Sequence, residues 1–139
     1  VDRTKRRRLG LEMAEAYTKA WLNYGPVGRS ENTEYYRNIY CPLQGDPILD
    51  NAVRELRTGA KGMYGLLPFL ATQPPERGGY IELAVDPTLD TVKEGYTLQS
   101  DDTRVKITGK ESVGVLYGAF HVLRLTATRK SIQGLPGLL

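Results

Sequence analysis

The spacing of apolar residues after Asp46 and Pro47 constrains the fold more than any other feature of the chain. An aspartate followed by a proline is typical of a helix start, because the carboxylate accepts from free N–H groups and proline at the first helical position loses no hydrogen bond. Residues 47–61 then combine an apolar stripe with a charged face. This pattern predicts an amphipathic helix that ends near Gly62.

A second pattern, with a period of two residues, predicts β-strands. Residues 80–85 alternate apolar side chains with others, and residues 94–108 have the form of a hairpin whose turn lies at residues 100–103. Residues 35–41 are rich in tyrosine and isoleucine and precede a proline. They predict a further strand.

The last predicted helix starts at or near Ser112 and carries apolar residues at helical spacing from Val113 to Leu125. It also contains Gly114 and Gly118 on one face. A glycine within a helix costs about 1 kcal/mol relative to alanine. The pair therefore predicts that a sheet or another helix approaches this face closely.

Weaker patterns assign the remaining segments. Residues 9–23 predict a short helix, although residues 21–24 are equally compatible with an extended segment. Loops are predicted at residues 28–32 and 73–79, and the apolar residues 65–70 continue or follow the central helix. Helices separated by strands predict an α/β (α+β) fold, a single domain in which two main helices pack on one face of a mixed β-sheet.

Length and composition agree with one globular domain. The chain has 139 residues, of which 40% are hydrophobic and 25% charged, as in soluble domains of this size. Its apolar runs are too short to cross a membrane. One cysteine, Cys41, and one histidine, His121, cannot supply an internal disulfide or the four protein ligands of a structural zinc site.

Basic residues cluster near the beginning of the chain. The formal net charge is +3, and five of the 19 Lys and Arg residues lie within residues 2–8. The run from Lys5 to Arg8 is typical of a solvated tail, with contact to nucleic acid or an acidic membrane as the alternative. No aromatic residue is interleaved with the run, so neither partner is predicted. Acidic residues from Glu12 onward interrupt the apolar run that a secretory signal needs.

Motifs that carry catalysis do not occur in the sequence. It has no GxSxG, P-loop or HExxH pattern, and His121 has no nucleophilic partner that the sequence identifies. The segment from Glu76 to Gly79 predicts either a ligand-contacting loop or an ordinary charged turn. No catalytic, cofactor-binding or metal-binding residue is therefore predicted.

Four segments of the chain form an order that is characteristic of one family. They are GGYIEL at 78–83, EGYTL at 94–98, VKITG at 105–109 and GVLYGAFHVLRL at 114–125. Together they resemble the N-terminal domain of glycoside hydrolase family 67, the α-glucuronidases, and less closely the non-catalytic domain that precedes the β-hexosaminidase barrel. The segment WLNY at 21–24 also fits, so the resemblance spans about residues 20–130.

The resemblance implies an accessory domain that precedes a TIM-barrel catalytic domain of the same chain. Family 67 enzymes are inverting glycosidases that remove (4-O-methyl)glucuronic acid from xylooligosaccharides without a metal or cofactor, and their catalytic carboxylates lie in the barrel. Residues 20–130 are then non-catalytic and lack hydrolase activity on their own. Residues 1–19 form a basic tail and short helix, and residues 131–139 begin a linker to the barrel.

Candidates for packing against the barrel are Gly114, Tyr117, Gly118 and Arg77. The alternative is an independent carbohydrate-binding module that uses Arg77 and surface tyrosines, since the chain contains nine tyrosines. The family includes both secreted and intracellular members, so the resemblance leaves the compartment open between cytoplasmic and periplasmic or secreted.

Overall fold

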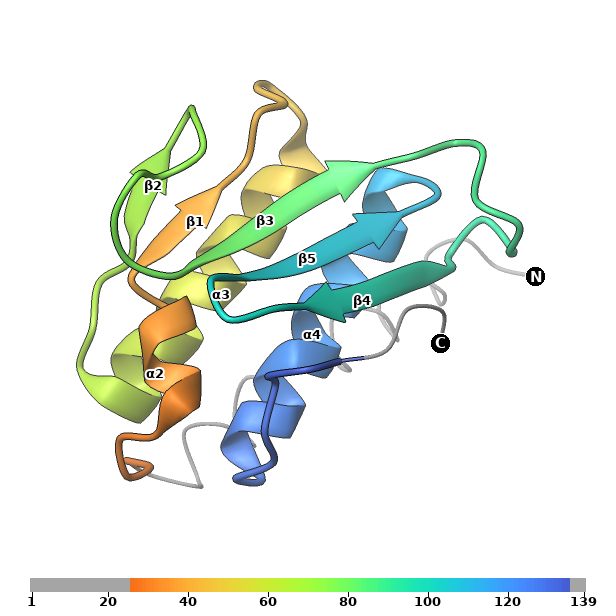
Figure 1. The fold of residues 1–139 in the computed structure, drawn as a ribbon. Helices are drawn as coiled ribbons and strands as arrows, with labels where there is room; N and C mark the ends of the chain where they lie inside the picture. The colour runs from red at the N-terminus through yellow and green to blue at the C-terminus, as the bar shows by residue number, and fades with distance from the viewer. Residues whose placement is uncertain (1–25, 136–139) are drawn as a thin grey trace, which may run out of the picture.

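A five-stranded sheet organises residues 26–135, the part of the chain that the computed structural model describes (Figure 1). The elements in chain order are α2 (Glu31–Tyr35), β1 (Asn38–Tyr40), α3 (Pro47–Tyr64), β2 (Phe69–Ala71), β3 (Tyr80–Val85), β4 (Tyr96–Ser100), β5 (Arg104–Gly109) and α4 (Ser112–Ala127). The strand order is β2-β1-β3-β5-β4. Only β4 among these strands runs antiparallel to its neighbour.

The two long helices, α3 and α4, cover the same face of the sheet (Figure 1). This arrangement confirms the predicted α/β fold with a mixed sheet and two main helices on one face. The opposite face carries polar side chains: the Glu82 carboxylate lies 3.0 Å from the Arg104 guanidinium and 3.9 Å from the Lys106 ammonium. The helices therefore bury the apolar face of the sheet, and no helix within residues 26–135 covers the charged face.

Helix α3 begins as the sequence predicts but is longer at its end. The Asp46 carboxylate accepts from the backbone N–H groups of Ile48 and Leu49, at 2.9 and 3.3 Å. The predicted end near Gly62 is wrong, because the helix continues to Tyr64. It stops at Gly65, which has a φ of 67° in the left-handed region and donates its N–H to the Lys61 carbonyl.

A short helix, α2, replaces part of a predicted loop and part of a predicted strand. Residues 28–32 were predicted as loop and 35–41 as strand, yet residues 31–35 are helical and the strand is confined to Asn38–Tyr40. The Ser30 hydroxyl accepts from the Asn32 N–H at 3.2 Å, and the Thr33 hydroxyl accepts from the Ser30 N–H at 3.0 Å. These reciprocal bonds satisfy free N–H groups and nucleate the helix.

The sequence does not predict strand β2, because its apolar residues 65–70 are expected to continue or follow the central helix. The strand pairs with β1 through only three residues, Phe69–Ala71, and lies at the edge of the sheet. Phe69 and Leu70 are both exposed. Burial therefore does not alternate along β2, and a period of two residues could not reveal it.

The predicted strand at 80–85 and the predicted hairpin are confirmed as β3 and the antiparallel pair β4 and β5. The predicted last helix is confirmed as α4, although Glu111 rather than Ser112 occupies its N-cap position and makes no side-chain cap. The Ser112 hydroxyl instead donates to the Asp46 carboxylate. This bond ties the beginnings of α3 and α4 together.

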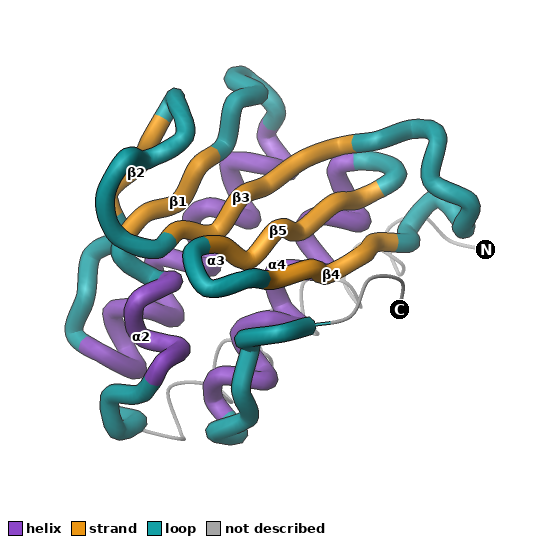
Figure 2. Tube along the Cα trace, in the orientation of Figure 1, coloured by secondary structure: helices purple, strands orange, loops and turns teal. Residues whose placement is uncertain are grey.

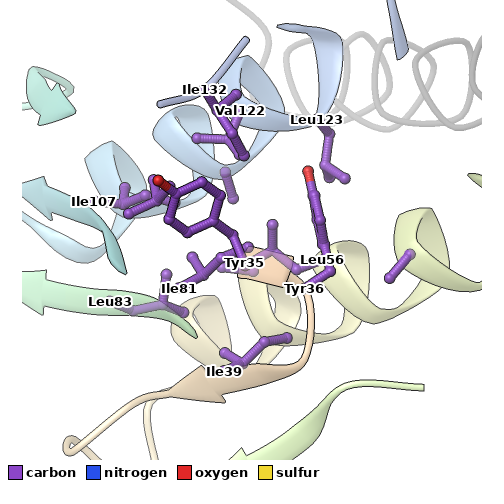
Figure 3. Packing of buried hydrophobic residues seen from close by; sticks show 14 of the residues in the cluster. Tyr35, Tyr36, Ile39, Leu56, Ile81, Leu83, Ile107, Val122, Leu123 and Ile132 are labelled. Carbon is purple, nitrogen blue, oxygen red and sulfur yellow. The ribbon is translucent and has the colours of Figure 1, made fainter. Parts of the chain in front are cut away.

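The core lies between the sheet and the two helices, as Figure 3 shows for its central residues. Fully buried side chains from the sheet and helices include Ile39, Ile81, Leu83, Val105, Ile107, Leu49, Leu56, Val115, Val122 and Leu123. Burying each such side chain contributes about 1.5–3 kcal/mol relative to leaving it in water. This layer, rather than any single polar contact, holds the helices on the sheet.

Residues 131–135, assigned from the sequence to the beginning of a linker, pack against the domain. The Ile132 side chain is fully buried, and its N–H donates to the Asn32 side-chain oxygen at 2.9 Å. Asn32 also donates to the Lys130 carbonyl at 2.8 Å. The chain then turns back towards β4, where the Leu135 N–H donates to the Ser100 hydroxyl at 2.7 Å (Figure 2). The packed domain thus extends beyond residue 130.

The predicted helix at 9–23, the basic run from Lys5 to Arg8 and the predicted tail 1–19 lie wholly outside the described residues. Within residues 26–135, no helix is both long and apolar enough to cross a membrane.

Gly118 in the middle of α4 faces the sheet at very short range. A Cβ built on it would lie 2.5 Å from Ile107 Cγ2 on β5 and 3.2 Å from the Tyr96 ring on β4. Ile107 is fully buried and β-branched, so its methyl group has little freedom to move. The close approach predicted from the glycine spacing is therefore made by the sheet of the same domain.

We expect Gly118→Ala to lower the free energy of unfolding by about 1–3 kcal/mol, because overpacking outweighs the gain in helix propensity. Urea denaturation measures the change. A higher midpoint at an unchanged m-value would contradict this expectation.

Candidate interaction surfaces

The single histidine belongs to the contact between α4 and β4. His121 Nδ1 lies 3.0 Å from the Tyr96 hydroxyl. Burial, together with the nearby Arg124 cation, lowers the pKa of His121 below its ordinary value. The lowered pKa favours the neutral ring, and in the tautomer with its hydrogen on Nε2 the Nδ1 atom accepts a hydrogen bond from the Tyr96 hydroxyl. Residues 26–135 contain no cluster of three or more acidic, histidine or cysteine side chains that could hold a metal.

Helix α4 is apolar around nearly its whole circumference, whereas α3 is amphipathic. The 16 residues of α4 include only two basic side chains, His121 and Arg124, and no acidic one. The 18 residues of α3 include Asp50, Arg54, Glu55, Arg57 and Lys61. A helix with a charged face is suited to a water-facing layer, whereas a helix that is apolar all round is typically buried from every side.

Four apolar or aromatic residues at helical spacing on α4 are not fully buried, although two of them, Leu116 and Phe120, pack partly against the core, and the exposed Arg124 lies on the same side of the helix. The four are Val113, Leu116, Tyr117 and Phe120, and we call them the outer face of α4. The sheet and α3 bury the opposite side of the helix, including Val115 and Val122. Tyr117 is 44% exposed, the largest exposure of any hydrophobic residue of α4. The outer face is therefore a candidate contact surface.

Of the four residues predicted from the sequence to pack against the barrel, two are buried within the domain and two are exposed. Gly114 and Gly118 are buried against β4, β5 and the segment before β4. Tyr117 and Arg77 are exposed, the first on α4 and the second in the loop before β3. The structure thus accounts for both glycines within the domain, and a direct contact with another domain falls to Tyr117 and Arg77. The role of all four in such an interface stays a prediction.

The described tyrosines do not form an exposed platform. Tyr35, Tyr36 and Tyr80 are buried, and Tyr40, Tyr64 and Tyr96 are partly buried. Within residues 26–135, Tyr117 is the only exposed tyrosine. Several stacked sugar rings would need more than one exposed aromatic ring, so this part of the chain gives a tyrosine-based carbohydrate-binding module no support.

A hollow of about 380 Å³ opens between α3 and the edge strand β2. Three cations from successive turns of α3 line it: Arg54, Arg57 and Lys61. Its other lining residues are Asp50, Val53, Thr58, Leu67 and Leu70. We call this site the basic groove.

From the sequence alone, Arg54 and Arg57 belong to the charged face of the helix predicted at residues 47–61. Their spacing with Lys61, at intervals of three and four residues, does place three cations on one side of the helix. The hollow itself could not be predicted, because it exists only where the unpredicted strand β2 lies beside α3.

The family model for the "Glycosyl hydrolase family 67 N-terminus" matches residues 20–122. This match covers most of the chain and includes every described element except the last turn of α4. The chain belongs to this family.

Curated relatives of this family 67 N-terminal domain carry the name α-glucuronidase. The chain is 30% identical over 135 residues to probable alpha-glucuronidase A of Aspergillus terreus and 29% identical over 138 residues to the protein of that name from Aspergillus niger. It is 30% identical over 137 residues to alpha-glucuronidase A of Emericella nidulans. These alignments cover 84–87% of the chain but only 16% of each relative.

The segments that carry the family 67 resemblance form the central part of the fold. GGYIEL leads into β3, EGYTL and VKITG enter the β4–β5 hairpin, and GVLYGAFHVLRL occupies most of α4. Gly95 of the second segment lies against Gly114 of the fourth. In this family 67 domain, the segments that resemble the family thus lie in packed strands and helices. Their shared role in this part of the chain is to form the fold.

Proposed function

We propose that this chain is the N-terminal accessory domain of an α-glucuronidase, joined to a catalytic domain that follows it in the same polypeptide. The relatives are about six times longer than the matched segment, since it covers 16% of their length. The parent enzyme would remove (4-O-methyl)glucuronic acid from xylooligosaccharides, with the catalytic carboxylates in the following domain.

The observation that supports an accessory role is the apolar circumference of α4. One side of this helix packs on the sheet and on α3, and its outer face also carries apolar side chains, of which Tyr117 is exposed, with Arg124 one turn beyond Phe120. Exposed apolar patches of this kind mark contact surfaces. We propose that the outer face of α4 packs against the catalytic domain.

The path of the chain supports the same surface. Leu135 is held beside β4 by its bond to Ser100, and β4 is the edge strand next to which α4 packs. The last described residue therefore lies on the side of α4 and β4 rather than on the side of β2. A following domain would meet α4 with a short connection.

We expect Tyr117→Asp to weaken association between this chain and the separately expressed catalytic part of the parent enzyme by at least about tenfold. A charge placed in an apolar contact must lose its water, which costs several kcal/mol unless it is paired. Calorimetric titration of one part with the other measures the affinity. Release of 4-O-methylglucuronic acid from aldouronic acids should come from the catalytic part and not from this chain alone.

Gln73→Asp, in the exposed loop after β2, is the matched control for added charge and should leave the affinity unchanged. Unaltered affinity in Tyr117→Asp would contradict the proposed surface. Release of glucuronic acid by this chain alone would contradict the accessory role itself.

A further inference from the structure

The basic groove has an excess of positive charge that the protein itself does not neutralise. Within residues 26–135, none of its three cations forms an ion pair, and Asp50 is the only acidic residue in its lining. Among the described residues, the Arg54 guanidinium donates only to the Asn51 side chain, at 3.2 Å. Two positive charges therefore remain for a ligand that enters the groove.

The Arg57 side chain contains a buried hydrogen-bond donor that lacks an acceptor within residues 26–135. Its Nε is buried and has no hydrogen-bond acceptor among the described residues, and it is the only such side-chain atom in this part of the protein. A buried donor without an acceptor is unfavourable, because it has lost its hydrogen bond to water and gained none in return. An anion bound in the groove would supply the acceptor, and a carboxylate fits best because it can accept from two N–H groups of one guanidinium.

The groove also offers apolar surface next to the cations. Leu67 and Leu70 are 70% and 46% exposed, and both line the hollow together with Val53. The Thr58 hydroxyl and the Asp50 carboxylate can form hydrogen bonds with the hydroxyl groups of a polar ligand. A sugar ring that carries a carboxylate presents these three chemistries at once: apolar C–H surface, hydroxyl groups and one negative charge.

The groove lies at the opposite edge of the sheet from the proposed contact with the catalytic domain. It is formed beside β2, the first strand in the sheet order, whereas α4 and the outgoing chain lie beside β4, the last. Figure 1 shows β2 and β4 at the two ends of the sheet. A catalytic domain seated on the outer face of α4 would leave the groove open.

We propose that the basic groove binds the uronic acid side groups of a xylan chain, with the sugar carboxylate between Arg57 and Lys61. The proposal rests on the proposed function for its choice of uronate, because that enzyme acts on glucuronic acid substituents. Bound in this way, the domain holds a substituted xylan through a group that is remote from the catalytic centre.

The test is calorimetric titration of the purified chain at low salt with three probes: a xylotriose bearing one 4-O-methylglucuronic acid, unsubstituted xylotriose, and sodium acetate. We expect the acidic oligosaccharide to bind at least about tenfold more tightly than either of the others, since only it combines the charge with the sugar ring. Arg57→Gln and, independently, Lys61→Gln should each weaken its binding about tenfold. Lys93→Gln, an exposed cation outside the groove in the segment before β4, is the matched control and should not change it.

Equal binding of the acidic and neutral oligosaccharides, or unchanged affinity in both groove variants, would overturn the proposal. Acetate binding as tightly as the acidic oligosaccharide would assign the groove to simple carboxylates, such as the side chains of an acidic protein segment, and would also overturn it. All of these variants leave α4 intact, so association with the catalytic part still reports on the proposed function separately.

Discussion

Replacing Gly114 with alanine is expected to lower the free energy of unfolding by about 3 kcal/mol, at the upper end of the usual cost of overpacking. The added methyl group would collide with the Gly95 carbonyl oxygen and approach Gly109 Cα to 3.2 Å. Both obstacles are backbone atoms, which cannot rotate away as a side chain can. The Gly95 carbonyl also accepts from the Lys110 N–H at 3.1 Å, so moving it would strain that bond as well.

Gly28→Ala is the control for this substitution, because nothing lies within 4 Å of a Cβ built at Gly28. It should leave stability unchanged or raise it by up to about 1 kcal/mol, through the lower entropy of the unfolded chain. Chemical denaturation of both variants gives the comparison. If Gly114→Ala were as stable as Gly28→Ala, the contact between the start of α4 and the segment before β4 would be looser than the structure shows.

Ile132→Ala is expected to cost about 2–5 kcal/mol, the range for removing most of a buried aliphatic side chain. Ile132 is completely buried and belongs to the same cluster as Val122 and Tyr35 (Figure 3). Its N–H would still donate to Asn32, so the loss would report on packing alone. A loss of this size would mean that a protein ending at Lys130 lacks part of its core.

Gln133→Ala provides the comparison, because Gln133 is exposed and follows Ile132 directly. Its effect should stay within about 0.5 kcal/mol. Equal midpoints for the two variants in urea would show that residues 131–135 contribute little to stability, as expected of a linker.

The elements predicted correctly are those whose burial follows a regular period. Helix α3 has one buried stripe and a capping aspartate, and β3 alternates between the core and the charged face of the sheet. The pair of glycines in α4 correctly predicted a close approach, because a helix rarely keeps two unfavourable residues without a packing reason.

The elements that could not be predicted depend on contacts between distant parts of the chain. Strand β2 exists only because β1 lies beside it, and three residues are too few to show a period. Residues 131–135 look like the beginning of a linker because Gly134, Pro136 and Gly137 follow a single isoleucine, yet a hydrogen bond to Asn32 holds Ile132 in place. The basic groove could not be predicted for the same reason. It forms only because β2 lies next to the charged face of α3, and that face alone is typical of any helix exposed to water.

The bonds of Asn32 to Lys130 and Ile132 have a consequence for how the protein is made. They join residues that are 98 and 100 positions apart, and a ribosome adds about 5–20 residues per second. About 5–20 s therefore separate the synthesis of Asn32 from that of its partners. During this interval the α2 region is present without the segment that completes its contacts. The contacts of the α2 region are therefore completed only after Lys130 and Ile132 have been synthesised.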